Sequence, residues 1–167
     1  MAEHELLITR LIAYPIDVVF DAWTDPGQLV QWFAPRDCQI VVCKLDLREG
    51  GKFHWCVKNP NYPDCWCTGE FLRIRSPFLI QYKIRFSDPQ GNPVSAQKAF
   101  KQPDWPEETL VTVGFTEQGD DTEITIRQSV VEAVARTSGA YQGWIEMMDK
   151  LQLLLSPASV DPNQSIL

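Results

Sequence analysis

The sequence predicts an α+β fold in which a curved antiparallel sheet wraps around one long C-terminal helix. From the N-terminus, its pattern indicates a strand, two short helices, about six strands and a long amphipathic helix. Strands joined by short turns pair antiparallel, and a sheet with one apolar face must cover that face. The long helix is the only predicted element large enough to do so. Because a curved sheet encloses more space than its side chains fill, we expect an apolar pocket between sheet and helix.

The N-terminal part predicts one strand and two short helices. Residues 4–13 are rich in β-branched and aliphatic side chains, which is typical of a strand. Pro15 ends this strand and suits the first turn of a helix. Residues 16–24 have apolar side chains at helical spacing, and the break at residues 25–27 separates them from a second helix that ends before Pro35.

The middle of the chain predicts the rest of the sheet. Alternation is clearest where Phe53, Trp55 and Val57 share one face of a strand. A segment with four prolines, residues 87–108, predicts a long loop, and loops of this length often act as lids. Strands are expected at residues 39–47, 52–57, 65–74, 80–86, 110–116 and 123–131.

The C-terminal helix has the strongest helical periodicity. Ser138-Gly139 predicts a break or kink near its start, and Ser156-Pro157 predicts its end. We expect residues 1–155 to form one domain and residues 156–167 to form a loosely ordered tail. The apolar positions at i, i+3, i+4 and i+7 are Trp144, Met147, Met148, Leu151, Leu154 and Leu155.

Composition excludes several classes of protein. The chain has 167 residues, a net charge of −7 and no Lys/Arg cluster, which argues against nucleic acid and anionic membranes as partners. The N-terminus does not resemble a signal peptide, and no apolar run approaches a membrane span, so we expect a cytoplasmic protein. The five cysteines are expected to be free thiols, since their number is odd and no secretion signal is present.

Short motifs resemble a known family. Their order matches the domain shared with activators of the ATPase of the 90-kilodalton heat-shock chaperone, over roughly residues 6–155. Phe33 and Glu49 depart from the family, which more often has Trp and Pro there. The matching motifs are residues 18–26 (VVFDAWTDP), 32–35 (WFAP), 46–51 (DLREGG), 69–71 (GEF), Pro77, Gly143-Trp144 and 149–151 (DKL).

The resemblance implies a fold and a choice of functions. The family belongs to the START-like (SRPBCC) superfamily, whose helix-grip folds often bind apolar small molecules. It also implies a bacterial protein of this single domain, either monomeric or homodimeric. Binding of an unidentified apolar small molecule is therefore the expected function. A chaperone-interacting module in the stress response is one alternative, although full-length activators make much of the chaperone contact through a separate N-terminal domain.

The residues themselves predict the walls of the pocket. Face parity and helical spacing bring a set of aromatic and methionine side chains together, although plain core packing would give the same pattern. Trp66 and Cys67 lie on opposite faces of their strand, and the sequence leaves open which one points inward. The predicted lining is Phe33, Phe53, Trp55, Tyr82, Phe86, Phe115, Trp144, Met147 and Met148.

Two chemical sites are alternative interpretations of the sequence. His54, Cys56, Cys65 and Cys67 are possible zinc ligands, but no C-x-x-C motif is present, and we expect neither metal nor cofactor. A cyclase- or hydrolase-like enzyme is a second alternative, and its possible acid–base groups are Arg10, Glu70, Arg127 and Glu132.

Known catalytic motifs are missing from the chain. The sequence has no G-x-S-x-G, H-E-x-x-H or Gly-rich phosphate loop, so no catalytic residue is assigned and an enzyme is not favoured. Gly143 inside the last helix costs up to about 1 kcal/mol relative to Ala, which predicts that the sheet packs closely against it.

Overall fold

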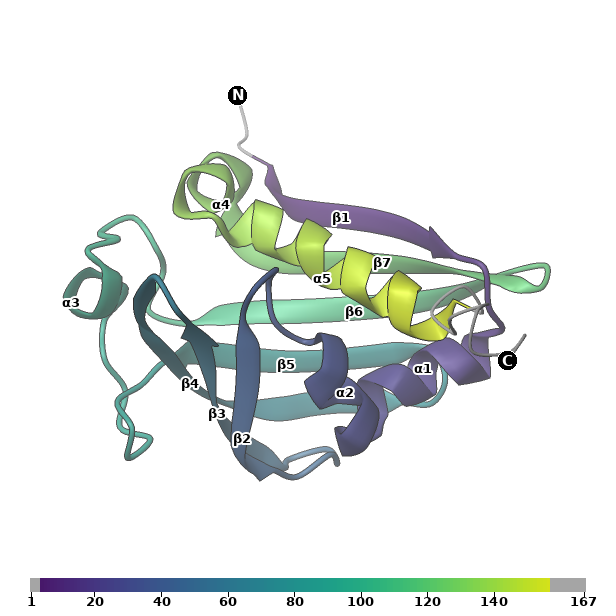
Figure 1. Ribbon diagram of the computed structural model, residues 1–167, viewed down its shortest axis with the longest axis horizontal. Coiled ribbons are helices and arrows are strands. Elements are labelled where there is room, and N and C mark those ends of the chain that lie inside the picture. The colour runs from purple at the N-terminus through teal and green to yellow at the C-terminus, as the bar shows by residue number, and fades with distance from the viewer. Residues whose placement is uncertain (1–3, 157–167) are drawn as a thin grey trace, which may run out of the picture.

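The computed structural model describes residues 4–156 of the chain (Figure 1). It begins with β1 (Glu5–Ile12), which is followed by α1 (Ile16–Thr24) and α2 (Pro26–Trp32). Asp25 separates the two helices, and its side chain caps α2 by accepting a hydrogen bond from the Gly27 backbone N–H. These elements lie where the sequence predicts them. Residues 157–167, most of the predicted tail, lie outside the described residues.

Six strands follow, with one short helix among them. The connection between β5 and β6 is long, as predicted, but it contains one helical turn, α3 (Ala96–Phe100). The Ser95 hydroxyl caps this turn by accepting a hydrogen bond from the Lys98 backbone N–H at 3.1 Å. The strands are β2 (Gln39–Leu45), β3 (Lys52–Asn59), β4 (Tyr62–Arg75), β5 (Leu79–Phe86), β6 (Thr109–Gln118) and β7 (Asp121–Val131).

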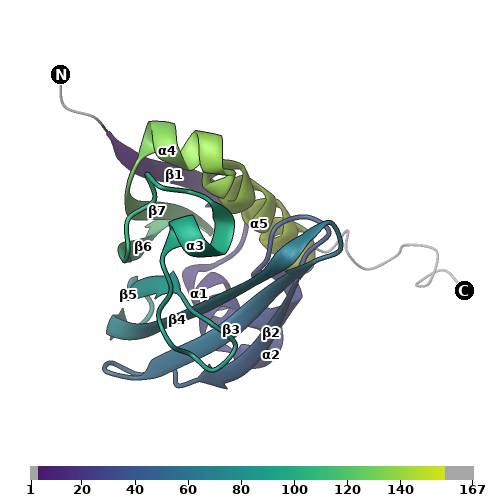
Figure 2. The same ribbon diagram turned by 90° about the vertical axis from the view of Figure 1, so that its left-hand side faces the viewer.

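All of these strands form one antiparallel sheet in the order β1-β7-β6-β5-β4-β3-β2. Each strand from β2 to β6 pairs with the next along the chain, while β1 pairs with β7. The consecutive strands β1 and β2 therefore form opposite edges, and α1 and α2 carry the chain between them (Figure 1). Figure 2 shows the sheet curving around α5, which confirms the predicted helix-grip architecture.

The C-terminal helix is divided in two at Gly139. This residue joins α4 (Glu132–Ser138) to α5 (Ala140–Leu155) and has a φ of 90°, a backbone conformation that glycine adopts without strain. The predicted break is therefore confirmed. Four side chains of α5 are buried against the rest of the molecule: Trp144, Met147, Met148 and Leu151.

Helices α1 and α2 close one end of the sheet with aromatic side chains. The ring centroid of Trp23 lies 4.7 Å from that of Trp32 and 5.8 Å from that of Phe115 in β6. The indole nitrogen of Trp32 donates a hydrogen bond to the Ala22 carbonyl at 2.9 Å. The cavity described below lies at the other end of the sheet.

The helices within residues 4–156 are all too short or too polar to cross a bilayer. The expected cytoplasmic location and the oligomeric state stay predictions.

Candidate ligand-binding cavity

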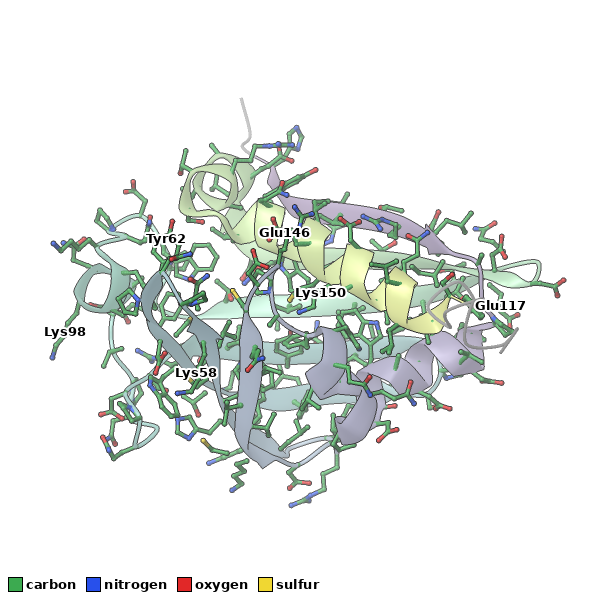
Figure 3. The ribbon with its side chains drawn as sticks, viewed as in Figure 1. Lys58, Tyr62, Lys98, Glu117, Glu146 and Lys150 are labelled. Carbon is green, nitrogen blue, oxygen red and sulfur yellow. The ribbon has the colours of Figure 1, made fainter. Side chains whose placement is uncertain are left out.

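A cavity of about 860 Å³ lies between the curved sheet and α5. Strands β3 to β7 form its floor, the first half of α5 forms one wall, and two connecting segments complete it. Ligand sites for small molecules commonly have volumes of about 300–1,000 Å³. Figure 3 shows Tyr62 of β4 and Glu146 of α5, two lining residues that come from opposite walls.

Six of the predicted pocket residues line this cavity. Its inner wall is aromatic: Phe33 lies 5.3 Å from Trp55 and 6.1 Å from Trp144, measured between ring centroids. Except for Phe33, which follows α2, these side chains come from the faces that alternation and helical spacing assign to the inside. They are Phe33, Trp55, Tyr82, Phe86, Trp144 and Met147.

The other three predicted residues lie in the packed core and do not border the cavity. The Phe53 ring stacks behind Trp55 with 4.0 Å between centroids. Phe115 packs against Phe20 of α1, and Met148 is fully buried. The predicted lining is wrong for these three, because periodicity fixes the face on which a side chain lies but not its distance along the strand or helix from the open end.

The register of β3 and β4 decides which way Trp66 and Cys67 point. Trp55 pairs with Cys67, and Cys56 pairs with Trp66. Directly paired residues of antiparallel strands point to the same face, so Cys67 faces the cavity and Trp66 faces outward. On that outer face, the ring of Trp66 lies 5.3 Å from that of His54.

The same register separates the four possible zinc ligands. Cys65 pairs with Val57 and lies on the cavity side with Cys67, whereas His54 and Cys56 point to the other side of the sheet. The four side chains therefore cannot surround one ion. Within residues 4–156, no three His, Cys, Asp or Glu side chains form a group suited to a metal.

The possible acid–base residues lie outside the cavity. Arg10 bonds to Asp149 at 2.9 Å, and Glu132 bonds to Arg136 at 3.1 Å. Glu70 lies 3.9 Å from Lys83, and Arg127 is exposed. None of the four lines the cavity, so the interpretation of these groups as pocket acids and bases is wrong.

A buried polar network crosses the cavity floor. Trp144 Nε1 donates to Gln128 Oε1 at 2.9 Å, and Gln128 Nε2 donates to Thr109 Oγ1 at 2.9 Å. Sequence reasoning missed Gln128 and Thr109. The available signal was a polar side chain, Gln128, at an inward position of a strand whose alternate positions, Ile124 and Ile126, are apolar.

Tyr82 supplies a polar group to the same space. It is buried and lines the cavity, and its hydroxyl has no hydrogen-bond partner among the described residues. Burial, together with the neighbouring Cys67 thiol, raises the pKa of Tyr82 well above its ordinary value of 10.0. Tyr82 is therefore a neutral phenol that can donate or accept one hydrogen bond.

The predicted lid segment, residues 87–108, forms part of the cavity wall. Phe100 and Trp105 both line the cavity and pack on Phe86 of β5, with centroids 4.9 Å and 6.2 Å from its ring. This aromatic contact attaches the segment to the sheet.

The segment between α2 and β2 forms the opposite rim. The Arg36 backbone N–H donates to Glu146 Oε1 at 3.1 Å. Lys150 Nζ donates to the Ala34 carbonyl at 2.9 Å and to the Cys38 carbonyl at 3.5 Å. These bonds hold the rim against α5.

Gly143 lies on the cavity wall, not against the sheet. A Cβ at this position would come no closer than 3.4 Å to a heavy atom, the Cγ of Pro35. The prediction that the sheet packs closely against this glycine is wrong, because α5 bridges the cavity at this point.

Solved structures share the whole fold. A protein from Chromobacterium violaceum has a TM-score of 0.74 at 19% identity, and the match covers 92% of this chain and 99% of that one. A protein from Staphylococcus epidermidis has a TM-score of 0.74 at 24% identity, with coverage of 99% and 93%. A protein from Mycobacterium smegmatis has a TM-score of 0.75 at 22% identity, with coverage of 90% of both chains.

Sequence comparison gives the family. No match was found among the curated proteins with which the sequence was compared. The model of one family, described as "Activator of Hsp90 ATPase homolog 1-like protein", matches residues 13–156. This range contains all five helices and six of the seven strands of the described residues. The chain therefore belongs to the Activator of Hsp90 ATPase homolog 1-like family, with the helix-grip fold of START-like proteins.

Proposed function

We propose that the protein binds an apolar small molecule that carries one hydrogen-bonding group, in the cavity between the sheet and α5. The observation that carries the proposal is a cavity of about 860 Å³ whose inner wall combines Phe33, Trp55, Trp144 and Met147 with the unpartnered hydroxyl of Tyr82. Aromatic and methionine side chains give an adaptable apolar surface. A ligand group that hydrogen-bonds to this hydroxyl would fix the orientation of the ligand in the cavity.

The charged side chains of the lining support binding rather than chemistry. The lining has four charged residues. Arg36, Lys101 and Glu146 lie on the rim segments and on the first half of α5, and Arg85 lies on β5, paired with Thr68, at a position that alternation assigns to the outer face. The buried hydroxyl and amide side chains of the lining are Tyr82, Thr109 and Gln128, and the last two already bond to each other. An acid–base mechanism needs two ionisable groups within hydrogen-bond reach of one ligand. A chaperone contact has no observation in its favour beyond family membership.

Ligand content and a blocked cavity together test the proposal. Native mass spectrometry of protein purified without added ligand is expected to show a bound small molecule. Ligand-free protein is expected to bind the apolar dye 8-anilinonaphthalene-1-sulfonate saturably and to change the fluorescence of Trp55, Trp105 and Trp144, which line the cavity.

Ile84→Trp fills the cavity from β5 and is expected to weaken dye binding about tenfold or more. Lys83→Trp, one residue away on the outer face of the same strand, is the matched control and is expected to bind like wild type. The proposal fails if wild type carries no molecule and binds no dye saturably, or if Ile84→Trp binds as well as Lys83→Trp.

A further inference from the structure

Two thiols lie side by side on the cavity wall. Cys65 and Cys67 are both in β4, two residues apart on the face that lines the cavity, and their sulfur atoms are 3.8 Å apart. Cys65 is half-buried and Cys67 is buried. Both are free cysteines, and nothing in the family match or the proposed function assigns them a role.

The strand opposes a direct bond between these sulfurs. Residues two apart on a strand have Cβ atoms about 6.6 Å apart, because each residue rises about 3.3 Å. A disulfide requires Cβ atoms about 3.8 Å apart, so joining Cys65 to Cys67 would break the regular pairing of β4 with its neighbours. A single atom that bonds to both sulfurs removes this conflict, since the side chains already lean toward each other.

The protonation of Cys67 bears on which kind of atom can bridge the two sulfurs. The hydrogen bond with Cys65, followed by burial, raises the pKa of Cys67 well above its ordinary value of 9.0. Divalent metals bind thiolates and take more ligands than two, so they suit poorly a dithiol in which the buried Cys67 holds its proton. No third His, Cys, Asp or Glu joins the two thiols within the described part of the chain.

Trivalent arsenic needs neither ionised thiols nor further protein ligands. In the reaction of R–As(OH)₂ with two thiols, two As–O bonds and two S–H bonds break, and two As–S bonds form. Each thiol proton leaves with one hydroxide as water, and arsenic stays trivalent. The third substituent of arsenic, R, would then occupy the apolar cavity beside Trp55, which pairs directly with Cys67.

We propose that Cys65 and Cys67 form a dithiol site that chelates a trivalent arsenical with an apolar substituent. This proposal depends on the presence of the cavity, but it does not depend on the apolar ligand proposed above. Arsenical binding is detected as a covalent adduct, whereas binding of an apolar ligand is detected as a non-covalent complex. An experiment can therefore contradict one proposal without contradicting the other.

Phenylarsine oxide is the probe that tests the site. Intact-mass spectrometry of the full chain is expected to show one phenylarsenic unit bound with loss of two thiol protons. Excess 2-mercaptoethanol should leave this adduct in place and 1,2-ethanedithiol should remove it, because only a dithiol competes with a chelate. Cys65 and Cys67 share the tryptic peptide of residues 59–73, so the digest should carry the adduct on that peptide.

Single substitutions distinguish the pair from the other thiols. Cys65→Ser is expected to weaken phenylarsenic binding about 100-fold or more, since one thiol loses the advantage of a second attachment. Cys65→Ala, with folding checked by circular dichroism, provides a second variant of the half-buried position. Cys38→Ser and Cys43→Ser are the controls, one lining the same cavity and one exposed, and both should bind like wild type.

Three results would overturn the proposal. The first is wild-type protein that forms no adduct. The second is an adduct that 2-mercaptoethanol strips. The third is a folded Cys65→Ser or Cys65→Ala variant that binds phenylarsine oxide as tightly as Cys43→Ser does.

Discussion

The indole nitrogen of Trp144 donates a hydrogen bond of 2.9 Å to Gln128 Oε1 and thereby joins α5 to β7 at the cavity floor. Both residues are buried, and Gln128 Nε2 continues the network to Thr109. A helix that bridges a cavity has fewer packing contacts with the sheet than one that lies on it. This polar link therefore helps to set the position of α5 over the sheet.

Gln128→Ala is expected to lower the free energy of unfolding by about 1–3 kcal/mol, because it leaves the buried Trp144 N–H without an acceptor. Urea denaturation measures this difference. Gln81→Ala is the matched control: Gln81 also donates to a threonine hydroxyl, that of Thr112, at a part-buried position. We expect it to cost less than about 0.5 kcal/mol. Equal losses for the two variants would contradict a structural role for the Gln128 link.

Gly69 lies where the neighbouring strands approach too closely for a side chain. A Cβ at this position would collide with the Lys83 carbonyl oxygen and with the ring of Phe53. Phe53 pairs with Gly69 from the neighbouring strand β3. Gly69→Ala is therefore expected to lower the free energy of unfolding by about 1–3 kcal/mol through overpacking.

Gly114→Ala provides the comparison for this prediction, because Gly114 is also in a strand and a Cβ there would meet nothing within 4 Å. Its stability should match or slightly exceed that of wild type. Thermal unfolding of both variants checks this, and a Gly69→Ala protein as stable as Gly114→Ala would show that β4 and β5 tolerate a side chain there.

Tyr82 is expected to make the free energy of unfolding fall at alkaline pH. Because its pKa in the folded protein is raised above the ordinary value of 10.0, the folded state holds its proton after the unfolded state has lost it. The stabilising contribution is complete below pH 10 and falls above it, by about 1.4 kcal/mol for each pH unit. Cys67, whose pKa is also raised, adds a similar loss that begins near its ordinary value of 9.0.

Tyr82→Phe is thus expected to flatten the decline of the unfolding free energy above pH 10 and to leave the loss that begins near pH 9. Urea denaturation from about pH 8 to about pH 11.5 measures both slopes. Tyr62→Phe is the control, because Tyr62 is 71% exposed. If Tyr82→Phe and Tyr62→Phe follow the same alkaline curve, Tyr82 is not the group that holds the proton.

Lys150 stabilises the cavity rim through its two carbonyl bonds. Lys150→Met keeps most of the apolar stem but loses the bonds to Ala34 and Cys38, and we expect a cost of about 1–3 kcal/mol in urea denaturation. Hydrogen exchange of the segment between α2 and β2 should speed up in the same variant. Lys98→Met, at an exposed site, should leave both measurements unchanged; a rim that exchanges equally slowly in Lys150→Met would argue against this anchor.

The bulge in β3 shows why part of the site could not be predicted. Asn59 pairs with Tyr62 at the turn, and continuing that register would place Trp55 opposite Trp66. An irregularity between Val57 and Asn59 shifts the pairing by one residue and places Trp55 opposite Cys67. A shift of one residue exchanges the two faces of a strand, so this bulge puts Cys65 and Cys67 in the cavity and Trp66 outside.

The sequence by itself determined the order of the elements apart from the short helix α3, the break at Gly139 and the faces shared by Phe53 with Trp55 and by Trp144 with Met147. These features follow from local periodicity and from residues that restrict the backbone, which act within a few positions along the chain. Only the tertiary structure decided that Trp55 borders the cavity while Phe53 lies behind it. It also decided that the two thiols of β4 meet 3.8 Å apart on the cavity wall. Depth and register depend on contacts between strands and helices far apart in the sequence, and no local pattern encodes them.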